Sequence, residues 1–105
     1  MNRKRVQMLR NMIAGIPAKR INLDTFLRGG KTAHDCRTVA CIGGWASLYP
    51  PFIAQGLIRD GDLSTVTFAE FFDVPREIFA STAWSIERGT HKQTALRRLD
   101  KLLAR

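Results

Sequence analysis

The sequence has no run of about eighteen apolar residues, so it offers no segment that could cross a bilayer as a helix. Its first residues are basic, but no sustained apolar block and no A-x-A-like cleavage site of a secretory signal follows them. Only two cysteines, Cys36 and Cys41, occur among 105 residues, which is too few for a disulfide framework. Internal repeats and low-complexity tracts are absent. We therefore expect a cytoplasmic protein whose thiols stay reduced.

A complete nucleotide-binding motif is also missing. Gly29, Gly30 and Lys31 match the end of a phosphate-binding loop, but the pattern G-x-x-x-x-G-K-[ST] requires a glycine where Thr25 stands. No buried strand is predicted before these residues. We therefore exclude a nucleotide site of this type.

The densest group of potentially reactive side chains is incomplete as a catalytic or metal site. It consists of His34, Asp35, Cys36 and Cys41, with His91 as a distant addition. A zinc site needs four ligands, and C-x4-C with one nearby histidine does not supply them. A nucleophilic cysteine would need a base and an oxyanion site; amides at the start of the following helix could supply the latter. We expect no metal, no cofactor and no enzymatic activity, and an interior packing role for the thiols.

The positive charge of the chain is concentrated at its two ends. The net charge is +8, made up of +6 in residues 1–23, +5 in residues 88–105 and −3 in residues 24–87. If the terminal helices lie side by side, they form a basic face that attracts nucleic acid or an acidic protein surface. The alternative is a solvated surface that only keeps the protein soluble. The candidate partner- or phosphate-binding residues are Arg3, Lys4, Arg5, Arg97, Arg98, Lys101 and Arg105.

Residues 38–49, TVACIGGWASLY, predict one buried helix around which the rest of the chain packs, because they are apolar on nearly all sides. Thr38 would cap this helix, and Pro50 and Pro51 would end it. Two glycines in mid-helix cost about 1 kcal/mol each relative to alanine, so Gly43 and Gly44 indicate close contact between backbones.

The remaining pattern predicts a small single domain over residues 1–105, all-α, with about five helices and little or no strand. Asn2 would cap a helix over residues 3–16, and THKQ at 90–93 predicts a capping box that opens the last helix. TFAE at 67–70 predicts a second box, and Pro75 begins a short helix. INLDTFL at 21–27 fits a helical turn or an extended segment. The predicted core is Leu9, Ile13, Phe26, Val39, Ile42, Trp45, Phe68, Phe72, Ile78, Phe79, Leu96, Leu99 and Leu103.

The run DCRTVACIGGWASL resembles the signature C-G-T-x-x-C-[IL]-[AG]-G-[WH]-A of small, largely uncharacterised proteins from phages, prophages and bacteria. The residues that match it most specifically are Cys36, Thr38, Cys41, Gly44 and Trp45. Arg37 stands where that family usually has glycine. Upstream INLDTFL, downstream FAEFFDVPREIF and the closing basic TALRRLDKLL are similar to the corresponding parts of the family. The resemblance implies a mobile-element context in a bacterial host cell and implies no activity.

Three functional hypotheses follow. The first is a non-enzymatic binding protein that docks onto a host protein or nucleoprotein complex and modulates it, as anti-CRISPR and other counter-defence proteins do. The second is a basic nucleic-acid-binding regulator with a degenerate helix-turn-helix at 67–83, in which Asp73 replaces the turn glycine and Pro75 a capping serine. The third, a thiol or metal enzyme centred on Cys36, ranks last.

Overall fold

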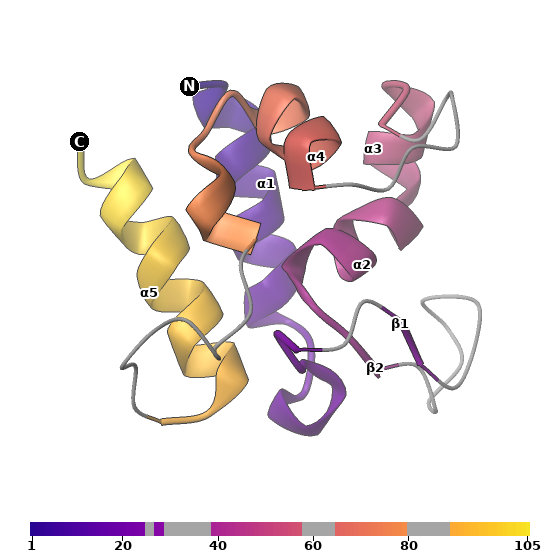
Figure 1. Cartoon of the computed structure of the whole chain (residues 1–105), viewed down its shortest axis with the longest axis vertical. Coiled ribbons are helices and arrows are strands. Elements are labelled where there is room, and N and C mark those ends of the chain that lie inside the picture. Colours follow the sequence, from indigo (N-terminus) through magenta and orange to yellow (C-terminus); the bar gives the residue numbers. More distant parts are fainter. Residues whose placement is uncertain (25–26, 29–38, 58–64, 80–88) are drawn as a thin grey trace.

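The two terminal helices, α1 (Arg3–Ala14) and α5 (His91–Leu103), lie side by side and run in opposite directions, as Figure 1 shows. This computed structural model describes residues 1–24, 27–28, 39–57, 65–79 and 89–105. Each helix buries the stripe that its apolar spacing predicts. The buried apolar side chains are Val6, Leu9 and Ile13 on α1, and Ala95, Leu99 and Leu102 on α5.

Both predicted N-caps of these helices are confirmed. Asn2 Oδ1 accepts a hydrogen bond from Arg5 N at 3.1 Å at the start of α1. At the start of α5, Gln93 N donates to Thr90 Oγ1 at 3.1 Å, and Thr90 N donates to Gln93 Oε1 at 2.8 Å. The reciprocal pair satisfies two of the amides that a helix start leaves without partners.

The central helix, α2 (Ile42–Leu48), is shorter than predicted. Val39 and Ala40 form β2, which pairs antiparallel with β1 (Leu27–Arg28), so the helix cannot begin at residue 38. Its cap is Cys41 and not Thr38, since Cys41 Sγ accepts from Gly44 N at 3.4 Å. The predicted burial is confirmed, because every residue from Ile42 to Ser47 is buried. The prediction of an all-α fold with little or no strand is confirmed, since the described residues contain only this short ladder and one isolated bridge besides helices, turns and loops.

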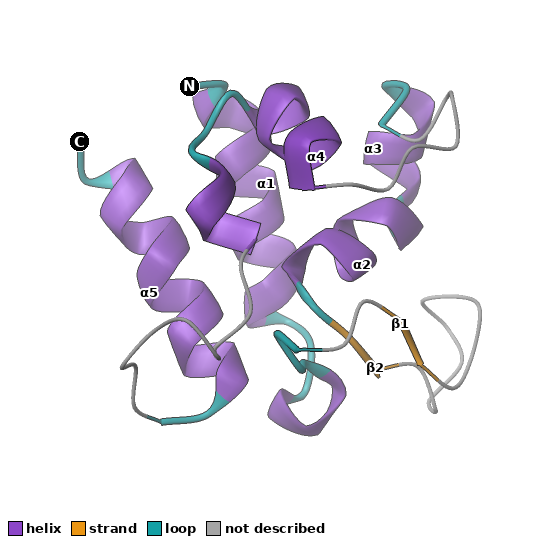
Figure 2. Cartoon of the chain, viewed as in Figure 1, coloured by secondary structure: helices purple, strands orange, loops and turns teal. Residues whose placement is uncertain are grey.

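Pro50 and Pro51 follow α2 and also begin the next helix. Tyr49 has extended backbone angles and separates α2 from α3 (Pro50–Ala54). Proline suits the first turn of a helix, where its missing N–H would have no intrahelical acceptor. The prediction that the prolines end α2 is therefore confirmed, and the prediction missed the helix that they begin (Figure 2).

The next helix, α4 (Thr65–Phe72), begins before the predicted capping box. Thr67 lies within the helix, so the box at TFAE is wrong. Asp73 follows with φ of 54°, a left-handed conformation that aspartate tolerates better than most residues and that ends α4. The described part of the following segment is a 3-10 helix, η2 (Arg76–Phe79); residues 80–83 of the predicted element lie outside the described residues.

The segment at 21–27, which the sequence left as either a helical turn or an extended piece, is extended at Ile21 and Leu27 and turns at Leu23 and Asp24. After η1 (Ala18–Arg20), Ile21 forms a parallel bridge to Ala40, and Leu27 pairs with Ala40 in the antiparallel ladder. The short η1 turn follows Pro17, which separates it from the end of α1. This segment is thus joined to β2, which leads into α2.

The core contains most of the predicted side chains. Among those predicted, Leu9, Ile13, Ile42, Trp45, Phe68, Phe72, Phe79 and Leu99 are buried. Ile78, Leu96 and Leu103 are half-buried against the core, and the side chains of Phe26 and Val39 are not among those described. Phe52, which was not predicted, is fully buried and lies edge-on to Phe72 at 5.1 Å between ring centroids.

Candidate functional site

Three of the seven candidate basic residues hold the fold together. The first is Arg3, which reaches from α1 to the end of α5. Its Nη1 donates to Leu103 O at 2.7 Å, and its Nη2 donates to Arg105 O. A cation at a helix C-terminus satisfies carbonyls that have no intrahelical partner and interacts favourably with the helix dipole.

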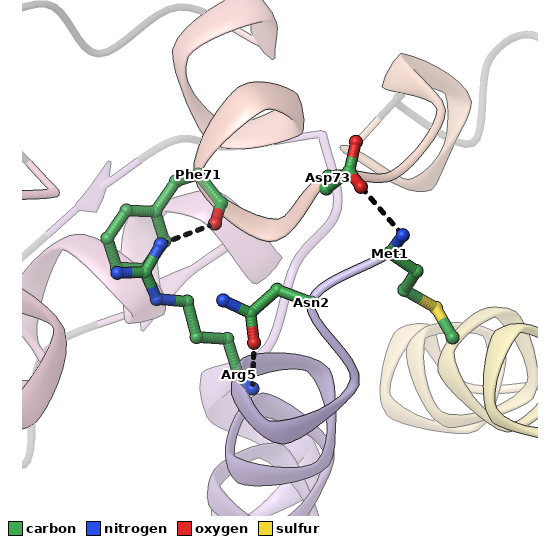
Figure 3. A network of polar contacts seen from close by, with 5 residues as sticks. All are labelled: Met1, Asn2, Arg5, Phe71 and Asp73. Carbon is green, nitrogen blue, oxygen red and sulfur yellow. Dashed lines mark hydrogen bonds and ion pairs between the residues drawn. The ribbon is translucent and has the colours of Figure 1, made fainter.

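Arg5 joins α1 to α3 and α4. Its guanidinium carbon lies 3.8 Å from the centroid of the Phe71 ring, and Nη1 donates to Phe71 O at 2.8 Å. Its Nε also donates to Gln55 Oε1 at 2.8 Å. Beside it, the N-terminal amine of Met1 pairs with Asp73 at 2.6 Å, as Figure 3 shows together with the Asn2 cap. This corner of the molecule is occupied by contacts within the fold.

Arg98 is buried, with 8% of its surface exposed, and its Nη1 donates to Ile78 O at 3.3 Å. The sequence contained a signal for this placement, because Arg98 falls on the same helical stripe as Ala95, Leu99 and Leu102. A charged side chain on a buried stripe needs hydrogen-bond partners inside the protein. Arg98 therefore belongs to the packed interior and cannot lie on an open basic face.

Two further cations, which the sequence did not single out, also connect α1 with α5. Arg10 Nε contacts Asp100 Oδ1 at 2.9 Å, and this hydrogen bond, with the attraction between the charges, raises the pKa of Arg10. Lys92 Nζ donates to Ala14 O at 2.9 Å at the opposite end of the pair. The two helix C-termini, one on α1 and one on α5, are thus each contacted by a cation of the other helix.

The other candidate cations lie on the surface. Lys4, Arg97, Lys101 and Arg105 are exposed, and Arg97 also donates to Thr94 Oγ1 at 3.2 Å. Arg97, Lys101 and Arg105 are four residues apart in succession, so they follow one side of α5 and its end. We call these three residues the α5 stripe. The structure brings these three together; it buries Arg98, and Arg3 and Arg5 donate hydrogen bonds to backbone carbonyls, while the Arg3 side chain stays exposed.

Trp45 of the signature is a structural residue. Its indole Nε1–H donates to Arg20 O at 2.9 Å, and the Arg20 guanidinium carbon lies 4.9 Å from the ring centroid. With 2% of its surface exposed, Trp45 packs α2 against η1. Of the other signature residues, Gly44 is buried, and Cys36 and Thr38 lie outside the described residues.

Gly43, beside the signature glycine, shows the predicted close approach. A Cβ atom at this position would lie 2.6 Å from Cε2 of the buried Phe68 ring. Phe68 in turn contacts Phe79 at 5.5 Å between ring centroids. Glycine at position 43 therefore lets α2 approach the aromatic cluster of α4 and η2.

Cys41 and His91, the cysteine and the histidine among the described residues, both accept hydrogen bonds within the fold. Burial raises the pKa of the Cys41 thiol, so the side chain is a weaker nucleophile than an exposed cysteine. His91 Nδ1 accepts from Leu23 N at 2.8 Å and joins α5 to the segment after η1. No group of three or more His, Cys, Asp or Glu side chains suited to a metal occurs in the part of the chain that the structure describes; His34, Asp35 and Cys36 lie outside it.

A pocket of about 350 Å³ opens beside Trp45, and we call it the Trp45 pocket. Most of its surface is apolar, and it is formed where α1 ends and where α2 passes into α3. The residues that line it are Met12, Gly15, Ile16, Pro17, Arg20, Trp45, Tyr49 and Pro50. Neither its position nor its lining was predicted, because the two segments are about thirty residues apart in the sequence and meet only in the folded chain.

Comparisons of this sequence and structure with protein-family models, with curated proteins and with solved structures found no match. The resemblance to the phage and bacterial family therefore stays a prediction, and the functional argument depends on this chain's own residues. Within the described ranges, no helix has the length and apolar character needed to span a membrane.

Proposed function

We propose that this chain is a small non-enzymatic protein of the mobile-element type. In this proposal it binds an acidic surface of a host protein or nucleoprotein complex in the bacterial cytoplasm and modulates that partner, as counter-defence proteins such as anti-CRISPRs do. The observation that supports it is that Arg3, Arg5 and Arg98 donate hydrogen bonds to backbone carbonyls of the fold, whereas the cations of the α5 stripe form a short exposed row.

Arg3, Arg5 and Arg98 donate to backbone carbonyls, so they are not presented as an array of phosphate contacts. The α5 stripe remains. At a rise of 1.5 Å per residue, its eight-residue span covers only about 12 Å. Proteins that bind duplex DNA with a steep salt dependence commonly make about 6–10 phosphate contacts. A short row of exposed cations is better suited to a cluster of carboxylates on a protein.

Complementary charge between exposed cations and an acidic surface guides the encounter of two proteins and disfavours partners of like charge, while buried contacts supply most of the affinity. The α5 stripe would therefore select and orient an acidic partner. The packed body, with its helix termini tied by Arg3 and Lys92, keeps the stripe in a fixed geometry.

The test is affinity capture from native bacterial lysate, with and without nuclease, by wild type, Lys101→Glu and Arg76→Glu. Both variants reverse one exposed charge; Arg76 lies on η2 and is not part of the α5 stripe. Circular dichroism confirms that each variant is folded. We expect one stoichiometric protein that survives nuclease and is weakened by Lys101→Glu but not by Arg76→Glu.

Two results would contradict the proposal. If the captured material disappears after nuclease, the basic side chains bind nucleic acid and the regulator hypothesis replaces it. If both variants weaken capture equally, the attraction depends on net charge and not on the α5 stripe.

A further inference from the structure

We propose that His91 is a pH-sensitive switch: its neutral ring holds residues 21–24 against the start of α5, and its protonated ring releases Leu23 from that contact. We call residues 21–24 the η1–β1 segment, because they join these two elements. The proposed function does not use His91, and the switch does not depend on which partner the α5 stripe binds.

The contact determines which ring nitrogen of His91 carries no hydrogen. Leu23 N donates to His91 Nδ1 at 2.8 Å, so the neutral ring has its hydrogen on Nε2. Turning the ring over would place a carbon atom opposite the amide and leave the amide without this acceptor. Leu23 has only 4% of its surface exposed, so water does not readily take the place of the ring nitrogen.

Protonation of His91 removes the acceptor. The imidazolium ion carries a hydrogen on both nitrogens and has no lone pair to offer. The N–H groups of Leu23 and of the ring would then point at each other across 2.8 Å, the distance of the present hydrogen bond. Because two donors repel at this distance, binding of a proton at Nδ1 and the contact with Leu23 exclude each other.

The position of His91 in the helix also disfavours a positive charge. His91 is the first residue of α5, where the helix dipole has its positive end and where cations are destabilised. The charged side chains on α5 next to His91, on η1 and in the η1–β1 segment are three cations and one acid: Lys92, Lys19, Arg20 and Asp24. The acid, Asp24, is exposed, so water screens its attraction for a protonated ring.

The other two elements that contact α5 bring their charges further along the helix. The last charged residue of α1 is Arg10, which pairs with Asp100. The 3-10 helix η2, which carries Arg76 and Glu77, meets α5 where Arg98 donates to Ile78 O, seven residues after His91. These groups therefore add no acid at the first turn of α5.

Release of Leu23 would be local. The preceding amide, Asn22 N, donates to Ala40 O at 3.0 Å, and Ile21 forms the parallel bridge to the same residue. Neither contact involves a group that titrates near neutral pH. Protonation of His91 should therefore detach the η1–β1 segment from α5 and leave its pairing with β2 in place.

The test is amide hydrogen exchange of the folded protein, followed by NMR at pH values from about 7.5 to about 5 and expressed as protection factors, which correct for the intrinsic effect of pH on exchange. The amide of Leu23 reports the switch, and the amide of Asn22 is the internal control. In His91→Asn, the side-chain oxygen takes the place of Nδ1 and accepts at any pH in this range. His34→Gln removes the other histidine, which lies outside the described residues. Circular dichroism verifies the fold of each variant.

A histidine in water has an ordinary pKa of about 6.5, so this change of pH favours a state that binds the proton by about thirtyfold over one that does not. We expect the protection factor of Leu23 to fall about tenfold or more in the wild type and in His34→Gln, and that of Asn22 to change less than about twofold. In His91→Asn, the protection factor of Leu23 should stay nearly constant.

Three results would overturn the inference. Constant protection of Leu23 in the wild type would mean that the contact does not respond to protonation. An equal fall in His91→Asn would assign the response to another group. A parallel fall at Asn22 and Leu23 would mean that the whole segment or the whole protein opens in acid, and not the contact with His91 alone.

Discussion

Replacing Trp45 by alanine is expected to lower the free energy of unfolding by about 3–5 kcal/mol, the usual range for removing a buried aromatic side chain. The ring has 2% of its surface exposed, and its removal leaves a cavity between α2 and η1. The substitution also removes the indole N–H that donates to Arg20 O. Since small domains are stable by only about 5–15 kcal/mol, this loss is a large part of the total.

The Trp45→Phe variant separates the two contributions. Phenylalanine keeps most of the buried apolar surface but cannot donate to Arg20 O, and a hydrogen bond of this kind contributes about 0.5–1.5 kcal/mol. We expect Trp45→Phe to lose about 1–2 kcal/mol, clearly less than the loss in Trp45→Ala. Comparable losses in the two variants would show that the indole N–H, and not ring packing, dominates.

The assay is urea unfolding followed by far-UV circular dichroism, because the substitutions alter tryptophan fluorescence directly. The linear dependence of the free energy on urea gives the difference between variants. A loss below about 1 kcal/mol for Trp45→Ala would refute the account, since it would mean that the ring does not hold η1 against α2.

Three further predictions concern other contacts. Gly43→Ala should lower the free energy of unfolding by about 1–2 kcal/mol in urea, because overpacking against Phe68 outweighs the gain in helix propensity. The control, Gly15→Ala, should be neutral or stabilise the protein by up to about 1 kcal/mol. A stabilised Gly43→Ala variant would contradict the close approach of α2 to Phe68. Arg3→Ala should lose about 0.5–1.5 kcal/mol in thermal melts by releasing the carbonyls at the end of α5, and an unchanged melting temperature would show that its hydrogen bonds add nothing. Because the pKa of Cys41 is raised, the folded chain holds the thiol proton more tightly than the unfolded chain. The contribution of the protonated thiol to the free energy of unfolding should therefore be complete below the ordinary thiol pKa of about 8.5 and should decline as the pH rises above it. With the other cysteine replaced by serine, iodoacetamide should modify the half-buried Cys41 more slowly in the folded than in the urea-unfolded protein, and equal rates would contradict its partial burial.

Local signals predicted the terminal helices well. The Asn2 cap and the Thr90–Gln93 capping box depend on residues within one helical turn, so their geometry can be inferred from sequence. The start of α2 could not be inferred in this way. Val39 and Ala40 are removed from the helix by pairing with residues 27–28, and only the folded chain brings these segments together.

The positions of the basic side chains also depend on contacts between distant segments, which the sequence alone does not reveal. Counting charge placed Arg3, Arg5 and Arg98 on one face with Lys101, but charge says nothing about which carbonyls a side chain can reach. Those acceptors belong to helix ends and turns far away in the sequence. Only Arg98 had a local signal, its position on the buried stripe of α5. The Trp45 pocket had none, because it arises where two helix ends meet.

The most direct test of the central claim, that this basic chain recognises protein and not nucleic acid, is a titration of the purified protein with labelled random duplex DNA at several salt concentrations. The exposed cations on or next to the terminal helices are Arg3, Lys4 and the three of the α5 stripe, so log Kobs should fall with log salt at a slope no steeper than about −4.5, at roughly 0.9 per phosphate contact. Affinity at physiological salt should be no better than the usual non-specific range of about 10⁻⁴–10⁻⁶ M. A slope of about −6 or steeper, with tighter binding at that salt, would contradict the claim.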